Sequence, residues 1–572
     1  MLKLWLFSCL LLLVFTIRPN LIQAVGTETA NNKFGIHLAV ADDKDLQSAA
    51  QLVNSSGGDW GYVTLVIGEN DRNKQKWQKI FDQLRELHLI PILRLATVFE
   101  NENWRRAKLK DAQGWTEFLN SLNWVVKNRY VILFNEPNHA NEWGGAVDPQ
   151  GYGEIAYEFA KTLKNKNPDF FVMLAGLDAA APHQPPNHED ETVFLRKIPT
   201  EIFDYLDGWA SHSYPNHGFI GSPLGDGRNS VKNYLWELSL LKQLRVRKNL
   251  PVFITEAGWP HAEGKTYQAN LYPQKQAAEN FKIYFARVID DPKVMAITPF
   301  VLNYQDTPFD HFSWQKLGSK QEFYPQYEVV RNLSKTKGEP EQVQKLKIVN
   351  DLPEKLITAS TYQIPIIVKN LGQAIWRQKD GYQLKLAEVD ETVRDHFFSD
   401  FSELKPFEEQ TVDLYLKTED TPGKVSLSLA VSKKGRLVSE TFPWPLEIIP
   451  PPNIKFRVNL FPKRKDTGND FKILVYNTEE QLVFEKSGIK VKNGLGEVQG
   501  VRNLAVGEKY RLVILKPYYL PRQEFLTIKE GENKISFKRM LPLDLNQDGN
   551  FSLKDIFFSF TNPQLMSLFW TS

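Results

Sequence analysis

Short runs of apolar and β-branched residues recur along the first 335 residues, and longer stretches with helical spacing separate them. Runs of this length and composition are typical of strands that are buried on both faces of a sheet. The chain contains eight of them, which are "KFGIHLAV" (33–40), "GYVTLVI" (61–67), "IPILRLAT" (90–97), "YVILFNEP" (130–137), "FFVMLAGLD" (170–178), "LDGWASHSYP" (206–215), "PVFITEAGWP" (251–260) and "VMAITPFVLN" (294–303).

The stretches between these runs have the period of amphipathic helices. In residues 74–88 the apolar side chains recur at i, i+3, i+4 and i+7 spacing, and 149–167 and 273–289 behave alike. Eight strands that alternate with helices predict a (β/α)8 barrel, of the α/β class, over 33–335. A doubly wound open sheet is the alternative fold. No glycine-rich phosphate loop follows the first strand, as a nucleotide-binding sheet of that kind would require.

The pattern changes after a polar linker at 335–342. Residues 343–450 contain strand-like runs without helices between them, which predicts an immunoglobulin-like β-sandwich. A proline-rich stretch separates this module from a second all-β module at 454–540. The two modules resemble immunoglobulin-like and transthyretin-like accessory domains, for which we expect a spacer role, with carbohydrate binding as the alternative. The last segment is 541–572.

The first 24 residues have the pattern of a secretory signal peptide. Lys3 supplies a positive start, an apolar core follows, and cleavage is expected after Ala24. The alternative is an uncleaved anchor, but the apolar run is shorter than a membrane span needs. We therefore expect a secreted or cell-surface protein with no membrane span in the mature chain. The single cysteine, Cys9, lies inside this segment, so disulfides and thiolate chemistry are excluded from the rest.

Composition narrows the function further. The formal net charge is +2 and no basic block stands out, so nothing points to a nucleic acid partner. The chain carries 14 Trp, more than a core of this size needs, and surplus Trp often lines sugar or peptide sites.

Two carboxylates stand at corresponding places in the strand pattern. Glu136 ends the fourth run and Glu256 ends the seventh, 120 residues later. A barrel brings the carboxyl ends of its strands to one face, so both side chains are expected over the same cavity. Two carboxyl groups that face each other across a sugar can cleave a glycosidic bond. One gives a proton to the leaving oxygen, and the other attacks the anomeric carbon.

The motifs "FNEPN" and "ITEAGWP" resemble the paired signatures of clan A retaining glycoside hydrolases, which are cellulase-like barrels. The resemblance covers about 300 of the 572 residues. It implies that Glu136 is the acid/base, that Glu256 is the nucleophile, and that Asn135 bonds the hydroxyl beside the reacting carbon. No cofactor is implied for catalysis.

Further motifs match the same clan. "SHSYP" resembles its His-x-Tyr element, which implies that His212 contacts substrate or the acid/base and that Tyr214 bonds the nucleophile. Arg94 resembles the strand-end arginine that keeps the nucleophile ionised. The chain departs from the clan at strand eight, where many members carry a Trp. The candidate sugar-stacking residues are therefore tryptophans that follow predicted strand ends, namely Trp143, Trp259 and Trp314.

"DLNQDGNFSLKD" (544–555) spaces its oxygen donors as an EF-hand calcium loop does, with a glycine at the sixth position. The expected calcium ligands are Asp544, Asn546, Asp548, Asn550, Ser552 and Asp555. The loop resembles one dockerin repeat, and no second repeat is visible. The resemblance implies a cohesin-like partner.

The main interpretation is a secreted glycoside hydrolase that cleaves a β-linked glycan with retention. The alternative is a non-catalytic carbohydrate-binding or scaffolding protein on the same barrel. A transglycosylase would use the same site and differ only in the acceptor.

Overall fold

The computed structural model describes residues 30–462 and 467–565, so the expected signal peptide lies outside the described residues. The chain divides into two compact units. The first comprises residues 30–122 and 128–341, and the second comprises 123–127 with the remainder of the chain. No described helix is both long and apolar enough to cross a membrane.

The first unit is built on eight parallel strands, one for each apolar run. They are β1 (Gly35–Leu38), β2 (Gly61–Gly68), β3 (Leu89–Ala96), β6 (Arg129–Leu133), β7 (Phe170–Leu174), β8 (Trp209–His212), β9 (Val252–Glu256) and β10 (Val294–Ile297). Their order is β1-β2-β3-β6-β7 and β10-β9-β8, and a parallel bridge between Phe34 and Ile297 brings the first and last strands together. The (β/α)8 barrel expected from the sequence is therefore confirmed.

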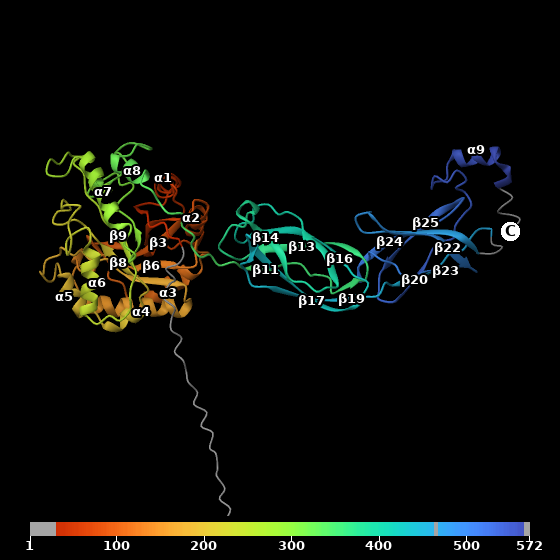
Figure 1. The fold of residues 1–572 in the computed structure, drawn as a ribbon, viewed down its shortest axis with the longest axis horizontal. Helices are drawn as coiled ribbons and strands as arrows, with labels where there is room; N and C mark the ends of the chain where they lie inside the picture. The colour runs from red at the N-terminus through yellow and green to blue at the C-terminus, as the bar shows by residue number, and fades with distance from the viewer. Residues whose placement is uncertain (1–29, 463–466, 566–572) are drawn as a thin grey trace, which may run out of the picture. The chain divides into compact units, whose positions relative to one another are not determined.

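Helices surround these strands in the red-to-green part of Figure 1. They are α1 (Asp43–Val53), α2 (Lys74–Glu86), α3 (Asp111–Asn120), α4 (Pro149–Lys166), α5 (Glu191–Lys197), α6 (Asn233–Gln243), α7 (Gln274–Val288) and α8 (Pro325–Arg331). Short elements in the loops are η1 (Glu69–Asp71), β4 (Phe99–Glu100), β5 (Asn103–Trp104), η2 (Ala140–Glu142), η3 (Thr200–Asp204) and η4 (Asp310–Phe312). Helix α2 buries Trp77, Ile80, Phe81 and Leu84, the stripe that its spacing predicts.

Aromatic side chains fill one layer inside the barrel. The rings of Tyr62, Tyr130, Phe171 and Phe253 contact one another at centroid distances from 4.9 to 6.3 Å. They come from β2, β6, β7 and β9, and β2 and β9 are not neighbours in the sheet. These rings therefore meet across the barrel interior, which makes it a packed core with room for a site only at its mouth.

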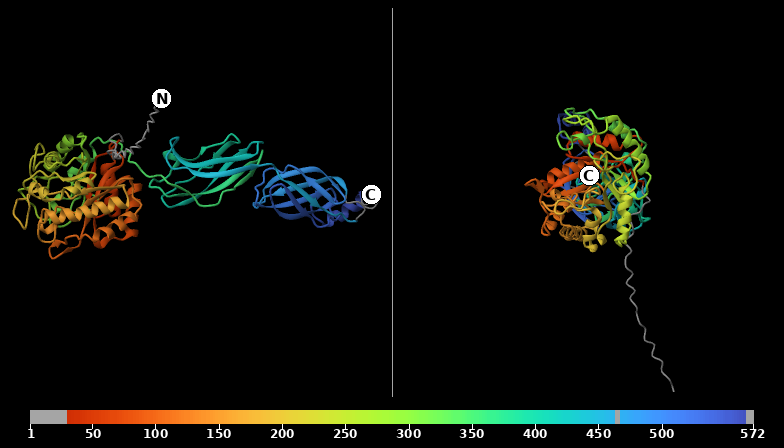
Figure 2. Two further views of the ribbon diagram at one scale, coloured as in Figure 1. Left: turned by 90° about the horizontal axis from the view of Figure 1, so that it is seen from below. Right: turned by 90° about the vertical axis from the view of Figure 1, so that its left-hand side faces the viewer.

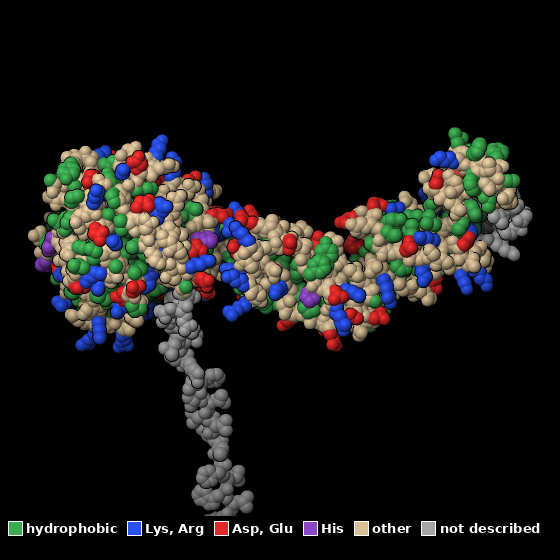
Figure 3. Space-filling model, turned by 45° about the horizontal axis from the view of Figure 1, so that its top comes forward, with side chains coloured by type: hydrophobic (Ala, Val, Ile, Leu, Met, Phe, Trp, Pro, Cys, Tyr) green, Lys and Arg blue, Asp and Glu red, His purple; other side chains and the backbone are tan. Residues whose placement is uncertain are grey.

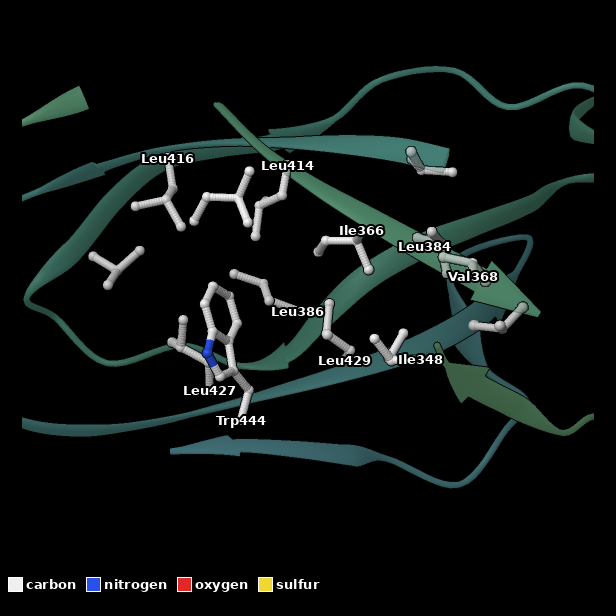
Figure 4. Packing of buried hydrophobic residues seen from close by; sticks show 14 of the residues in the cluster. Ile348, Ile366, Val368, Leu384, Leu386, Leu414, Leu416, Leu427, Leu429 and Trp444 are labelled. Carbon is white, nitrogen blue, oxygen red and sulfur yellow. The ribbon is translucent and has the colours of Figure 1, made fainter. Parts of the chain in front are cut away.

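The second unit begins with a β-sandwich. One sheet has the order β11-β13-β16-β15 and the other β12-β19-β17-β14. Figure 4 shows the apolar side chains between them, including Trp444, Leu414 and Ile366, and the left view of Figure 2 shows the strands of this module. The strands are β11 (Leu346–Ile348), β12 (Lys355–Ile357), β13 (Thr361–Asn370), β14 (Tyr382–Glu388), β15 (Val393–Phe398), β16 (Glu409–Thr418), β17 (Gly423–Lys433), β18 (Arg436–Leu437) and β19 (Phe442–Ile449), with η5 at Gln378–Asp380.

A seven-stranded sheet follows, in the order β25-β24-β21-β22-β23-β20-β26. Its strands are β20 (Asn453–Arg457), β21 (Gly468–Tyr476), β22 (Leu482–Lys492), β23 (Leu495–Val498), β24 (Lys509–Lys516), β25 (Tyr519–Thr527) and β26 (Glu532–Ser536). A separate apolar core that includes Phe471, Val475 and Leu512 supports it. Helix α9 (Leu553–Thr561) lies after this sheet along the chain.

Candidate active site

The carboxyl ends of four barrel strands carry the charged side chains of the site. Glu136 follows β6, His212 ends β8, Glu256 ends β9, and Arg94 lies near the end of β3. Parallel strands place these ends on one face of the barrel, so residues far apart in sequence meet there.

The two carboxylates lie close together. One side-chain nitrogen or oxygen from each of Glu136, His212 and Glu256 lies within 4.8 Å of the other two. In the described parts of the chain, no other group of three or more His, Cys, Asp or Glu side chains could hold a metal ion in this way. His212 Nδ1 lies 2.7 Å from Glu136 Oε1 and 3.8 Å from Glu256 Oε2. The histidine therefore stands between both acids.

Glu256 is held in its ionised form. Arg94 Nη1 donates to its Oε1, and the Tyr214 hydroxyl donates to Oε2 at 3.0 Å. Burial alone would raise the pKa of this carboxyl, but the nearby positive charges of His212 and Arg94 outweigh burial and lower the pKa to about 2. An anionic carboxylate at the mouth of a barrel has the charge that a nucleophile needs.

His212 takes part in this charge balance. Its side chain is only 1% exposed, and burial acts to lower its pKa, yet the carboxylates of Glu256 and Glu136 raise it above the ordinary value. The imidazolium form thus neutralises part of the negative charge between the two acids.

Backbone strain accompanies Glu136. Its φ is +28° and that of Phe134 is +73°, in a region that side-chain-bearing residues rarely occupy. The surrounding loop holds this turn, because Glu136 N donates to Gly176 O at 3.2 Å and the buried Asn138 Nδ2 donates to Asp178 O at 2.9 Å. Rigid support of this kind fixes where the carboxyl group points.

Gly176 makes room for the histidine. A Cβ at this position would lie 2.2 Å from Cδ2 and 2.5 Å from Nε2 of His212, closer than any side chain tolerates. Only a residue without a side chain permits the backbone to pass so near the imidazole.

Asn135 is oriented by two charged neighbours. Its Oδ1 accepts from Arg94 Nη1 at 2.7 Å, and its Nδ2 donates to Glu142 Oε2 at 3.2 Å. Burial, reinforced by the charge of Glu136, raises the pKa of Glu142 to about 7. Glu142 is thus a third carboxyl group in the cavity that we did not identify from the sequence. A glutamate in the loop "HANEWGG" has no feature that marks it as buried.

A cavity of about 320 Å³ opens beside these groups. Of the expected site residues, Arg94, Asn135, Glu136, Trp143, Tyr214 and Glu256 line it. One wall is aromatic and is made of Phe219, Phe300, Phe309 and Phe312, and Trp104 also lines the cavity. Neighbouring phenylalanines in this wall contact edge to face, with Phe219 and Phe312 at 5.4 Å and Phe300 and Phe309 at 5.2 Å.

Two expected sugar-stacking residues lie elsewhere. Trp259 and Trp314 are 2% and 1% exposed, pack against Phe281, and are not among the residues that line the cavity. Strand-end aromatics can pack toward the surrounding helices as well as toward the mouth, and these two pack against α7. Trp143 lines the cavity but is also 1% exposed, and its Nε1 has no hydrogen-bond partner among the described residues.

A charged pair completes the cavity wall. His139 Nε2 lies 2.9 Å from Asp178 Oδ2, and both residues line the cavity. Burial opposes both charges, yet the pairing raises the pKa of His139 and lowers that of Asp178. "NEPNH" places His139 three residues after Glu136, which was the available sequence signal for it.

A second candidate site is the loop at 544–555. Asp544 is 5% exposed, its Oδ2 accepts from Gly549 N at 3.1 Å, and its Oδ1 has no hydrogen-bond partner among the described residues. Asp555 Oδ1 accepts from the backbone of Leu545 and Asn546, and its Oδ2 closes a capping box with Ser552 at the start of α9. A buried carboxylate oxygen without a donor fits a calcium ligand, and the other donors are the oxygens that calcium prefers.

No family profile and no curated protein matches the chain. Among solved structures, a β-glucuronidase from Facaelibacterium prausnitzii L2-6 is 12% identical with a TM-score of 0.36, and the match covers 74% of this chain and 57% of that one. A β-mannanase from Thermomonospora fusca is 13% identical with a TM-score of 0.36, over 53% of this chain and 90% of that one. A glucosidase from Croceicoccus marinus is 11% identical with a TM-score of 0.34, over 86% and 97%. Likeness at this level carries no argument about function, which rests on the site geometry.

Proposed function

We propose that the protein is a glycoside hydrolase that cleaves β-linked glycans with retention of configuration. The observation that carries this proposal is the placement of single oxygens of Glu136 and Glu256 within 4.8 Å of each other. Retaining enzymes hold their two carboxyl groups about 5 Å apart, whereas inverting enzymes need about 6.5 Å or more to admit a water molecule.

In the proposed mechanism, Glu256 attacks the anomeric carbon while Glu136 gives its proton to the leaving oxygen. The glycosidic bond breaks and an ester to Glu256 forms. Glu136 is then a base, and it takes a proton from the water that hydrolyses the ester. Tyr214 and Arg94 keep Glu256 anionic before attack, and His212 balances the charge that moves between the two acids.

The aromatic wall supports a sugar substrate. Sugar rings have apolar C–H faces, which pack on aromatic rings, and Phe219 and Phe309 are 36% and 41% exposed beside the catalytic pair. Asn135, fixed by Arg94 and Glu142, is assigned to the hydroxyl next to the reacting carbon.

The test is replacement of Glu256 by Gln, assayed on soluble β-glucans, mannans and xylans and on aryl glycosides. Hydrolysis should fall at least about 10³-fold, because the amide of glutamine cannot act as the nucleophile that forms the ester. Glu154→Gln, an exposed position on α4, is the matched control. Full hydrolysis by Glu256→Gln would contradict the assignment of Glu256 as the nucleophile. No hydrolysis of any glycan by the native chain would favour the non-catalytic binding role.

For the C-terminal loop the proposal is structural calcium, held by Asp544, Asn546, Asp548, the carbonyl of Asn550, Ser552 and Asp555. Asp544 Oδ1, which has no hydrogen-bond partner within 30–462 and 467–565, supports it. Calcium titration of the full chain should show one bound ion, and Asp544→Ala should abolish that binding while Asp420→Ala retains it. Absence of binding by the native chain would make the loop a plain turn.

We also propose that helix α9 binds a protein partner and that the protein is exported. Helix α9 exposes Leu553, Phe557 and Phe560 by 82%, 74% and 79%, which is more apolar surface than a solvated helix usually shows. A cohesin-like partner would cover this apolar surface.

The proposal of export rests on residues 1–24, which have the pattern of a signal peptide, and N-terminal sequencing of the secreted protein tests it.

A further inference from the structure

Four neighbouring strands of the seven-stranded sheet, β22, β23, β20 and β26, present a strongly basic outward face. Strand alternation sends Ile454, Phe456, Val491 and Val498 into the core, so the residues between them point outward. Three of these strands are labelled in the blue part of Figure 1. The outward face surrounds a hollow of about 670 Å³.

The strand register arranges these side chains in two rows. Lys455 is directly opposite Glu497 on one side and Lys534 on the other, and Lys490 continues this row on β22. The second row contains Lys492, Leu495, Arg457 and Ser536. Five cations therefore share these two rows with one carboxylate, Glu497, and a second carboxylate, Glu532, lies at the edge beside them.

Few anions within the protein offset this charge. Glu532 at the edge pairs with Lys455 and, at 3.2 Å, with Lys534. Within 30–462 and 467–565, no side-chain ion pair or hydrogen bond engages Arg457, Lys490 or Lys492. Like charges on adjacent strands repel, so this arrangement costs stability unless an anion lies over it. Over the whole chain, by contrast, positive and negative charges nearly balance, with 70 Lys and Arg against 68 Asp and Glu.

The chemistry of the face selects among anionic partners. Leu495, 55% exposed, is the one large apolar side chain that the two rows present, so little is offered for insertion into a lipid surface. The rows carry no aromatic ring on which a nucleobase could stack. The hollow spans four strands, about 15 Å across, which matches a few linked sugar rings.

From these observations we propose that this face binds an acidic polysaccharide, through carboxylates held by Arg457, Lys490, Lys492 and Lys534. The face is a binding site separate from the barrel cavity. The choice of a glycan over another polyanion rests on the proposed function, but the binding itself requires no hydrolysis.

The experiment uses the full chain with polygalacturonate as the probe and isothermal titration calorimetry as the measurement. The native chain and its Glu256→Gln variant should bind equally, and binding should weaken as salt increases. Joint replacement of Arg457, Lys490 and Lys492 by Gln should weaken binding about tenfold or more, since each exposed contact contributes a modest amount. The matched control is joint replacement of Lys424, Lys434 and Arg436 by Gln, which removes the same charge from another module and should leave binding unchanged.

Several results would overturn the proposal. These are no binding of polygalacturonate by the native chain, equal weakening in both triple variants, or tighter binding to phosphatidylglycerol vesicles or duplex DNA. Lys492→Glu serves as a second variant if the triple one does not fold, and unchanged affinity in that variant would also contradict the proposal. Hydrolysis assays of Glu256→Gln are separate, so the two proposals can fail independently.

Discussion

At the scale of single residues, the site is an electrostatic arrangement in which each acid has a different environment. Glu256 accepts hydrogen bonds from Arg94 and Tyr214 and stays ionised. Glu142, which accepts a hydrogen bond from Asn135, has a pKa raised to about 7. Groups whose pKa values are driven apart by their surroundings are a recurrent property of acid–base sites.

Glu142 gives the first prediction. Its pKa is raised to about 7, and its carboxylate accepts a hydrogen bond from Asn135, so its protonation changes the site across neutral pH. The pH profile of kcat/KM should contain an inflection near pH 7 that Glu142→Gln removes. Glu154→Gln on α4 should keep the native profile. Identical profiles for the native protein and Glu142→Gln would show that this carboxyl does not influence the reaction.

The aromatic wall gives the second prediction. Phe219 contacts Tyr214 and Phe312 and is partly exposed toward the cavity. Phe219→Ala should raise KM about tenfold, because it removes about 1–2 kcal/mol of packing on the sugar, and it should change kcat little. Phe99→Ala, an exposed ring outside the cavity lining, is the control. A fall in kcat with KM unchanged would place Phe219 in a different role.

Only some of the site residues could be predicted from the sequence. Glu136 and Glu256 could be placed because strand counting fixes which strand ends share a face. His212 and Tyr214 were predicted from the resemblance of "SHSYP" to the clan's His-x-Tyr element. The aromatic residues that line the cavity could not be predicted, because the direction of a side chain after a strand end depends on the geometry of the loop. Trp259 and Trp314 consequently proved to be core residues, and phenylalanines line the wall instead.

At the scale of elements, close packing between strand ends sets the position of the catalytic groups. The backbone after β7 passes so near His212 that Gly176 has no substitute. Gly176→Ala should lower the free energy of unfolding by about 1–3 kcal/mol and kcat/KM by about tenfold or more, because the imidazole must move. Gly423→Ala, where a Cβ meets no atom within 4 Å, is the control. Native activity in Gly176→Ala would contradict this positioning.

A buried acid pair behind the site gives a stability prediction. Glu237 accepts from Trp209 Nε1 and Asn233 Nδ2, both at 3.0 Å, beside the fully buried Glu191. Burial raises the pKa of Glu237 to about 7, so the folded state holds its proton more tightly than the unfolded state does. The contribution of Glu237 to stability is therefore fully present below about pH 4.5 and falls, by about 3 kcal/mol at most, as pH rises to 7.

Glu237→Gln should flatten this decline, as measured by denaturant unfolding at pH 4.5, 6 and 7. The exposed Glu201→Gln should keep the native pH dependence. An unchanged slope in Glu237→Gln would mean that another group controls stability in this range.

At the scale of the whole molecule, the chain joins a barrel that could be identified from strand periodicity to β-modules whose surfaces could not. Figure 3 shows acidic and basic side chains interspersed on the visible face, in keeping with a net charge of +2. That near-neutral total conceals the basic face of the last sheet, because Lys and Arg on separate strands become neighbours only through register. The basic face is therefore evident only from the register in which β20 pairs with β23 and β26, and not from the sequence.

The central claim is that Glu136 and Glu256 act together at bond-breaking distance with retention. The most direct test is proton NMR of the anomeric configuration of the first product released from a β-glycan, before mutarotation. The account predicts that the β-anomer appears first, through an ester on Glu256. Initial release of the α-anomer would contradict it, because inversion needs a water molecule between carboxyl groups that lie farther apart than these two.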